Sequence, residues 1–118
     1  MNELGKVKMR EEKGVLVARV AGELDLSNSP ATGKAIEAAL PAASRALVVD
    51  LTPLTFLDSS GVAMLFRLVR RLGDHRQQLH VVAPEGQAVG RVLEIVDFGR
   101  AAPVHSALDA ALDAAQGA

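Results

Sequence analysis

Residues 46–72, ALVVDLTPLTFLDSSGVAMLFRLVRRL, contain the strand, loop and helix that decide the fold class. Residues 46–51 form a continuous apolar run, rich in β-branched residues and with an acid near its end, which is typical of a buried strand in an α/β sheet. Residues 52–57 predict a loop with apolar anchors. From Ser59 to about Leu72, apolar residues recur at spacings of three and four and predict an amphipathic helix. Its apolar stripe consists of Val62, Leu65, Phe66, Val69 and Leu72.

The turn Asp58-Ser59-Ser60-Gly61 stands at the head of that predicted helix. Unpaired amide donors and the positive end of the helix dipole stabilise an anion at such a position. A phosphate ester on Ser59 or Ser60 would therefore leave the helix folded while adding a charge of about −1.5 to −2. Gly61, which has no side chain, lets another backbone approach closely. The same turn also suits an ordinary helix cap by Asp58 or Ser59, and capping is compatible with switching.

The segment that precedes this stretch predicts a hairpin and a helix. Residues 7–11 alternate apolar and charged, and residues 15–21 are almost wholly apolar, so together they predict a β-hairpin that turns at Gly14. A helix is expected over about residues 30–40. Ser29 is its predicted cap, because a proline follows at the first helical position.

The segment that follows predicts two more strands and two more helices. Residues 79–83 are a short apolar strand, and residues 102–104 are an extended stub. Between them we expect a helix whose inward residues are Val89, Val92, Leu93 and Val96. Ser106 is the predicted cap of a last helix, and the chain is expected to fray from about Gln116. The buried stripe of that helix is Ala107, Leu108, Ala111, Leu112 and Ala115.

The order of these elements is β-β-α-β-α-β-α-(β)-α. Strands that alternate with helices predict an α/β fold with a mostly parallel sheet, and the opening hairpin adds one antiparallel edge. We therefore expect a single domain over residues 1–118, with a four- to five-stranded mixed sheet and about four helices.

Composition excludes several classes of protein. The 118 residues contain no cysteine, so disulfides and thiolate metal sites are excluded. The net charge of −1 and the absence of Trp and Tyr argue against a direct nucleic-acid binder. No apolar run reaches the roughly 18–20 residues needed to cross a bilayer, and the N-terminus does not read as a signal peptide. We expect a cytoplasmic protein without cofactor or metal.

Three short motifs follow one another along the chain: Gly22-Glu23-Leu24-Asp25, Val48-Val49-Asp50-Leu51 and Phe56-Leu57-Asp58-Ser59-Ser60-Gly61. Residues 98–112 come after them, with Pro103-Val104 ahead of the last helix. In this order and spacing, they resemble the STAS family, the sulfate-transporter and anti-sigma-factor-antagonist domains. The resemblance covers nearly the whole chain. The family often continues the turn with Gly-Leu-Gly, whereas this chain has Gly61-Val62-Ala63.

The resemblance implies a bacterial anti-sigma factor antagonist, which is a binding protein and not an enzyme. Its unphosphorylated form would bind an anti-sigma factor that is also a GHKL-type serine kinase, and would thereby release the sigma factor. Phosphorylation of Ser59, with Ser60 as the fallback acceptor, would end that binding, and a metal-dependent serine phosphatase would restore it. The implied partner-binding residues are Glu23, Asp25, Ser27, Asp58, Ser59, Ser60, Gly61 and Val62.

Other functions remain open from the residues alone. A constitutive binding module, within a stress-signalling scaffold or a lipid or anion transport complex, would use the turn without phosphorylation. An enzyme with Ser59 as nucleophile would need a base aimed at it, and His75, His80 and His105 all lie far from it in sequence. Nucleotide binding would call for a glycine-rich phosphate loop, which the sequence lacks.

Several charged residues also have two interpretations. Arg67, Arg70 and Arg71 fall largely off the apolar stripe, so they form either the solvated face of their helix or a docking surface for an acidic partner. Glu23 and Asp25 are either turn acids or partner contacts. The sequence predicts no membrane contact and leaves monomer or weak dimer open.

Overall fold

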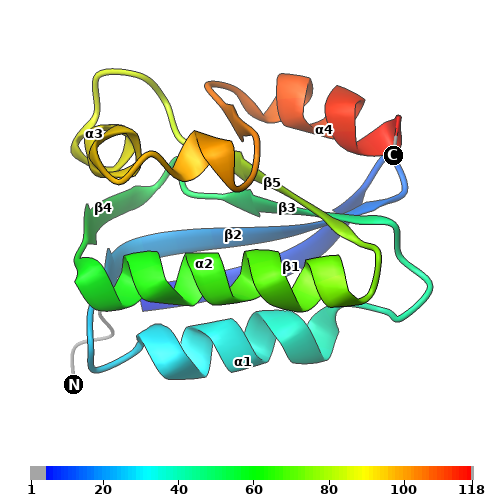
Figure 1. The fold of residues 1–118 in the computed structure, drawn as a ribbon, viewed down its shortest axis with the longest axis horizontal. Helices are drawn as coiled ribbons and strands as arrows, with labels where there is room; N and C mark the ends of the chain where they lie inside the picture. The colour runs from blue at the N-terminus through cyan, green and yellow to red at the C-terminus, as the bar shows by residue number, and fades with distance from the viewer. Residues whose placement is uncertain (1–4, 118) are drawn as a thin grey trace.

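A mixed β-sheet separates two layers of helices in the computed structural model, which describes residues 5–117 (Figure 1). Within these residues the sheet has six strands in the order β1-β2-β3-β5-β6, and β4 pairs with β2. β1 runs antiparallel to β2, and the other pairs are parallel. The strands are β1 (Gly5–Glu12), β2 (Val15–Leu24), β3 (Ala46–Asp50), β4 (Leu54–Leu57), β5 (Gln78–Val82) and β6 (Val104–His105).

The predicted α/β class and four α-helices are confirmed for the described residues. α1 and α2 lie side by side on one face of the sheet, and α4 covers the opposite face (Figure 1). The expected frayed tail includes Ala118, which lies outside the described residues. The helices are α1 (Ser29–Ala39), α2 (Ser59–Asp74), α3 (Ala88–Ile95) and α4 (Leu108–Gln116), with a 3-10 turn, η1 (Phe98–Arg100), after α3.

β3 is buried on both faces, which explains its uninterrupted apolar sequence. Leu47 and Val49 belong to the larger core, which includes side chains of α1, α2 and α3. Ala46 and Val48 belong to the smaller core beneath α4. The continuous run was therefore a correct signal for a central strand.

The predicted N-terminal hairpin is confirmed, with its turn at Lys13 and Gly14. Glu12 pairs with Val15, so only two residues connect the strands. Both turn residues have positive φ, 51° at Lys13 and 78° at Gly14, as a tight turn between twisted strands requires. The hairpin thus positions β2 along the middle of the sheet.

The predicted loop over residues 52–57 is wrong for its last four residues, because Leu54–Leu57 form β4. β2 is long enough to pair first with β3 and then, from Gly22 to Leu24, with β4. The open backbone groups at the end of β2 need a partner, and β4 supplies it. Leu54 and Leu57 are buried as well. This additional strand explains why the sheet exceeds the four or five strands expected.

Two predicted helix caps are also wrong. The residue before α1 is Asn28, and Ser29 is the first helical residue, with its hydroxyl buried and unpartnered among residues 5–117. Ala107, not Ser106, occupies the cap position of α4. Neither helix start has a side-chain cap hydrogen bond, so the nearest Ser does not decide where the helix begins.

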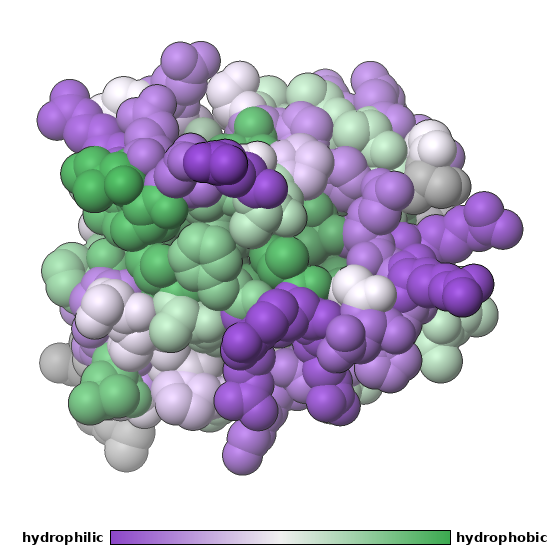
Figure 2. All heavy atoms as spheres, in the orientation of Figure 1, coloured by the Kyte–Doolittle hydropathy of each residue, from purple (hydrophilic) through white to green (hydrophobic). Residues whose placement is uncertain are grey.

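The buried face of α2 is wider than the predicted stripe. Met64 and Leu68 are buried, whereas Phe66 and Val69 are only partly covered. This follows from packing against both the sheet and α1. Figure 2 shows apolar side chains exposed between α2 and α3. Val96 and Ala107, which were expected to face inward, are exposed because they lie just outside α3 and α4.

Candidate functional site

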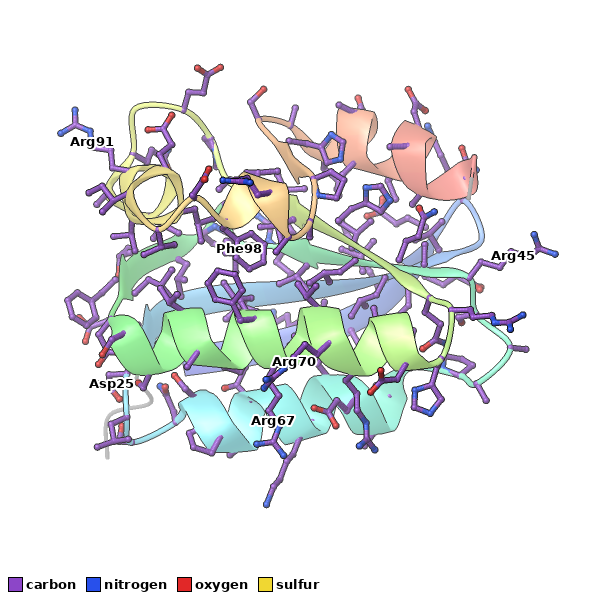
Figure 3. All side chains as sticks on the ribbon, viewed as in Figure 1. Asp25, Arg45, Arg67, Arg70, Arg91 and Phe98 are labelled. Carbon is purple, nitrogen blue, oxygen red and sulfur yellow. The ribbon has the colours of Figure 1, made fainter. Side chains whose placement is uncertain are left out.

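Two loops meet at one end of the sheet, one after β2 and one between β4 and α2. Leu24 pairs with Leu57 in a parallel ladder, so the residues that follow each strand emerge at the same edge. The amide of Asp58 donates a hydrogen bond to the carbonyl of Leu24 at 3.2 Å. In Figure 3, Asp25 lies beside the first turn of α2. The topology therefore joins the predicted Asp25 and Asp58 segments into one surface.

Asp58 is the N-cap of α2, as the capping interpretation predicted. Its Oδ1 accepts hydrogen bonds from the amide of Ser60 at 2.9 Å and from the amide of Gly61 at 3.1 Å. The Ser60 hydroxyl donates to the same oxygen at 2.6 Å. These bonds satisfy two of the unpaired donors that every helix N-terminus exposes.

The same contacts lower the pKa of Asp58 below its ordinary value of 3.8. The Ser60 hydroxyl has the largest effect. Desolvation opposes it, and the amides of Gly61, Ser60 and Leu26 add to it. The amide of Leu26 belongs to the loop after β2, so the carboxylate of Asp58 also interacts with that loop. Its charge is also retained at neutral pH.

We expect the Asp58→Asn protein to be less stable than the wild type at pH 7, with a difference that shrinks as the pH falls. A carboxylate whose folded pKa is lowered stabilises the fold above its unfolded pKa, and this stabilisation is lost as pH falls through the folded pKa. Thermal unfolding between about pH 2 and pH 7 measures the difference. Asp113→Asn, which removes an exposed carboxylate from α4, is the charge control. A difference in stability between Asp58→Asn and the wild type that stays constant over this pH range would contradict the expectation.

The two serines of the turn differ in their surroundings. The hydroxyl of Ser60 is held by Asp58. Ser59 is exposed, and its hydroxyl has no hydrogen-bond partner within residues 5–117. Ser59 is the first residue of α2, so its side chain stands outside the hydrogen-bonded turn. Of the two predicted acceptors, only Ser59 presents an unengaged hydroxyl to solvent.

Gly61 and Val62, which were predicted as partner-binding residues, lie inward. Val62 belongs to the larger core. A Cβ on Gly61 would lie 2.4 Å from Leu57 Cδ1 and 3.2 Å from Leu24 Cβ. The carbonyl oxygen of Leu24 would lie 3.4 Å from the same Cβ, so the backbone that approaches Gly61 belongs to this chain and not to a partner. Both residues therefore pack against the core and hold the turn in position.

The loop after β2 is braced in the same way as the turn. Asp25 Oδ1 accepts from the amide of Ser27 at 2.9 Å and from its hydroxyl at 2.5 Å. Asn28 accepts from the amide of Asp25 at 3.0 Å and donates to the carbonyl of Glu23 at 2.8 Å. Glu23 and Ser27 are exposed, and Asp25 is partly buried. Asp25 and Ser27 thus have a structural role, and Glu23 is bound through its backbone alone.

Two exposed apolar residues flank this surface, and the motif analysis gave neither a role in it. Leu26 is 76% exposed, and Phe56 on β4 is 47% exposed. Phe56 lies opposite Glu23 in the strand pairing. The sequence did contain a signal for the role of Leu26, because a large apolar residue between Asp25 and Ser27 is unusual in a polar turn.

The three histidines lie away from Ser59. His75 follows the C-terminal end of α2, where its Nδ1 lies 2.9 Å from the carbonyl of Arg71. His80 Nδ1 lies 3.1 Å from His105 Nε2, on β5 and β6. Burial, and then the neighbouring His105, lower the pKa of His80. No histidine among the described residues is placed as a base for Ser59.

Residues 5–117 contain neither a metal-binding cluster nor a membrane-spanning helix. No group of three or more His, Asp or Glu side chains there could hold a metal ion. No helix in that part of the chain is long and apolar enough to cross a bilayer.

Comparison with known proteins connects this geometry to a family. The family model of the STAS domain matches residues 6–111. The structure is similar to an anti-sigma factor antagonist from Mycobacterium paratuberculosis, with 30% identity, a TM-score of 0.84 and coverage of 95% of this chain and 94% of that one. This chain belongs to the STAS domain family. The resemblance drawn from the three motifs is thereby confirmed.

Other STAS structures share the fold at lower identity. The anti-sigma factor antagonist SpoIIAA in its unphosphorylated form has 22% identity and a TM-score of 0.73, with coverage of 96% of this chain and all of that one. The murine anion transporter Slc26a9 has 19% identity and a TM-score of 0.75; the match covers 92% of this chain but 19% of the transporter. No protein of curated function matches the chain in sequence. The similarity to antagonists supports that general role, while the fold also occurs in a transporter.

Proposed function

We propose that this STAS domain is a non-enzymatic anti-sigma factor antagonist of the bacterial cytoplasm, switched by phosphorylation of Ser59. The unphosphorylated form binds a GHKL-type serine-kinase anti-sigma factor and thereby releases the sigma factor. Phosphorylation ends the binding, and a metal-dependent serine phosphatase reverses it. The observation that carries the proposal is the exposed, unengaged hydroxyl of Ser59 beside a turn held by Asp58. Ser60 is less suited as acceptor because its hydroxyl is already bound.

The geometry supports a switch that acts at the surface and not through the fold. The bonds that start α2 come from Asp58 to Ser60 and Gly61, so a phosphate on Ser59 need not break them. The helix N-terminus tolerates the anion. At the partner surface, the same phosphate introduces an unmatched charge close to the Asp58 carboxylate. Desolvating such a charge in an interface costs several kcal/mol, and each 1.4 kcal/mol is tenfold in affinity.

The proposed partner surface combines apolar and polar groups. Leu26 on the loop after β2 and Phe56 on β4 supply exposed apolar area. Glu23 near the end of β2, and Asp25 and Ser27 on the loop after it, supply polar groups. Apolar anchors surrounded by polar groups are the usual composition of a specific interface. Asp58, Ser60, Gly61 and Val62 hold the turn in place.

Kinase reactions followed by mapping of the phosphate test the proposal. The protein is incubated with ATP and each anti-sigma kinase of its own genome, and the products are analysed by mass spectrometry. We expect a single phosphate on Ser59 and loss of the complex once it is present. Stable binding without any phosphate on the turn would instead favour a constitutive STAS module. Phosphate on Ser60 alone would overturn the assignment of Ser59.

We expect Leu26→Ala to weaken the complex with the anti-sigma factor about tenfold without changing the Tm. A side chain that is 76% exposed adds little to folding, whereas covering it with a partner contributes to binding. Titration calorimetry measures the affinity, and thermal unfolding measures the stability. Ile95→Ala on α3 is the matched control, because Ile95 is 82% exposed but lies outside this surface. Equal effects of the two substitutions would place Leu26 outside the interface.

A further inference from the structure

A groove of about 350 Å³ lies between α1 and α2. Its apolar part includes Gly33 of α1 and Met64 of α2, where the helices approach so closely that a Cβ on Gly33 would lie 2.8 Å from Met64 Cγ. Ser60 lies among its lining residues. The groove is therefore continuous with the turn that carries Ser59.

Three cations line the groove without a counter-ion. They are Lys34 from α1 and Arg67 and Arg70 from α2. None of them forms an ion pair with any of residues 5–117. The one carboxylate in the described lining, Glu37, lies 3.5 Å from Arg71, which already partners it. This part of the surface is cationic although the whole chain has a net charge of −1.

The figures show how these side chains are arranged. In Figure 3, Arg67 and Arg70 project over the junction of α1 and α2, whereas Arg45 and Arg91 lie at distant ends of the molecule. Strongly hydrophilic side chains gather over the same junction in Figure 2. Arg67 and Arg70 follow Ser60 by seven and ten residues, so they lie on its side of α2, roughly 10 and 15 Å along the helix.

We propose that this cationic groove docks an acidic segment of the same anti-sigma factor that contacts the Ser59 turn. The inference rests on the proposed function and adds a second contact to it. Charge complementarity selects the occupant: carboxylates of the segment pair with Lys34, Arg67 and Arg70, and its apolar side chains cover the surface near Met64. Continuity with Ser60 lets one partner occupy both places.

The pairing has a kinetic consequence. Complementary charges at the edge of an interface accelerate encounter more than they slow dissociation, and salt screens them. The cationic groove therefore makes association fast at low salt. Phosphorylation of Ser59 and neutralisation of the groove are separate ways to weaken the complex.

The test uses the full chain and its anti-sigma factor, with association rates measured by biolayer interferometry at low and high salt. We expect the Arg67→Glu/Arg70→Glu double variant to associate at least ~10-fold more slowly at low salt and to lose most of the salt dependence. Lys34→Glu, a change on the other helix, should act in the same direction. Arg45→Glu/Arg91→Glu is the matched control with the same change in net charge, and its rate should stay within about threefold of wild type.

The outcomes separate the two proposals. Circular dichroism establishes that each variant is folded, and Lys34→Glu replaces the double variant if the latter is not. Wild-type rates and salt dependence in the groove variants, with Ser59→Asp still unable to bind, would overturn the groove and leave the proposed function intact. An equal loss in groove and control variants would also overturn it, because net charge would explain the effect. A wild-type chain that binds no anti-sigma factor would overturn both.

Discussion

Ser59→Asp is expected to weaken binding of the anti-sigma factor at least ~100-fold, whereas Ser59→Ala stays within about threefold of the wild type. The hydroxyl of Ser59 has no bond to lose within residues 5–117, so Ala removes little. A carboxylate at the same place adds an unmatched charge beside Asp58. A hundredfold loss of affinity relative to the wild type corresponds to about 2.8 kcal/mol. Titration calorimetry of both variants against the anti-sigma factor measures it.

Ser106→Asp is the matched control for this substitution. Ser106 is exposed just before α4, so the same residue change is made near a helix start that lies outside the proposed interface. Its affinity should equal that of the wild type. Binding of Ser59→Asp as tight as that of Ser106→Asp would contradict a phosphorylation switch at Ser59 and leave a constitutive module.

Gly61→Ala is expected to lower the free energy of unfolding by about 1–3 kcal/mol, whereas Gly73→Ala in the same helix raises it by about 0.5–1. A Cβ on Gly61 would lie 2.4 Å from Leu57 Cδ1 and 3.2 Å from Leu24 Cβ, and both leucines are buried. Overpacking there displaces the junction of the two loops. Nothing lies within 4 Å of a Cβ on Gly73, so that substitution gains helix propensity alone.

Denaturant unfolding of the two glycine variants measures this contrast. Both substitutions add one methyl group to α2, so the difference between them reports the local packing at Gly61. Partner affinity should fall with Gly61→Ala and stay unchanged with Gly73→Ala. If both substitutions raised the free energy of unfolding equally, Leu57 and Leu24 would have to move aside from the Gly61→Ala methyl group without loss of stability.

Much of the fold could be predicted from local pattern. The hairpin at Gly14, the buried run of β3 and the amphipathic α2 all have signals within a few residues. β4 lacked such a signal, because its four residues become a strand only when the end of β2 offers an unpaired ladder. The caps at Ser29 and Ser106 were misplaced as well, since neither helix start has a side-chain cap hydrogen bond.

The candidate site likewise has features that the sequence predicts and features that depend on tertiary contacts. Asp58 as a cap and the serine turn were readable from four consecutive residues, and the motifs were sufficient to indicate the STAS family. The family resemblance favoured Ser59 over Ser60 as the acceptor. Which of the two hydroxyls bonds to Asp58 could not be predicted from the sequence, because either could have turned toward it. The inward position of Gly61 and Val62 likewise depends on Leu24 and Leu57, whose approach is a tertiary contact.

The sequence by itself therefore determined the α/β order, the family and the turn at the head of α2, because periodicity, β-branched runs and capping residues act over short separations. The tertiary structure alone decided which hydroxyl is exposed, that the loop after β2 joins this turn, and that Lys34 faces Arg67 and Arg70 across one groove. These relations depend on parallel pairing of β2 with β4 and on the packing of α1 against α2. Such contacts connect residues about 30 positions apart, and no local pattern in the chain specifies their geometry.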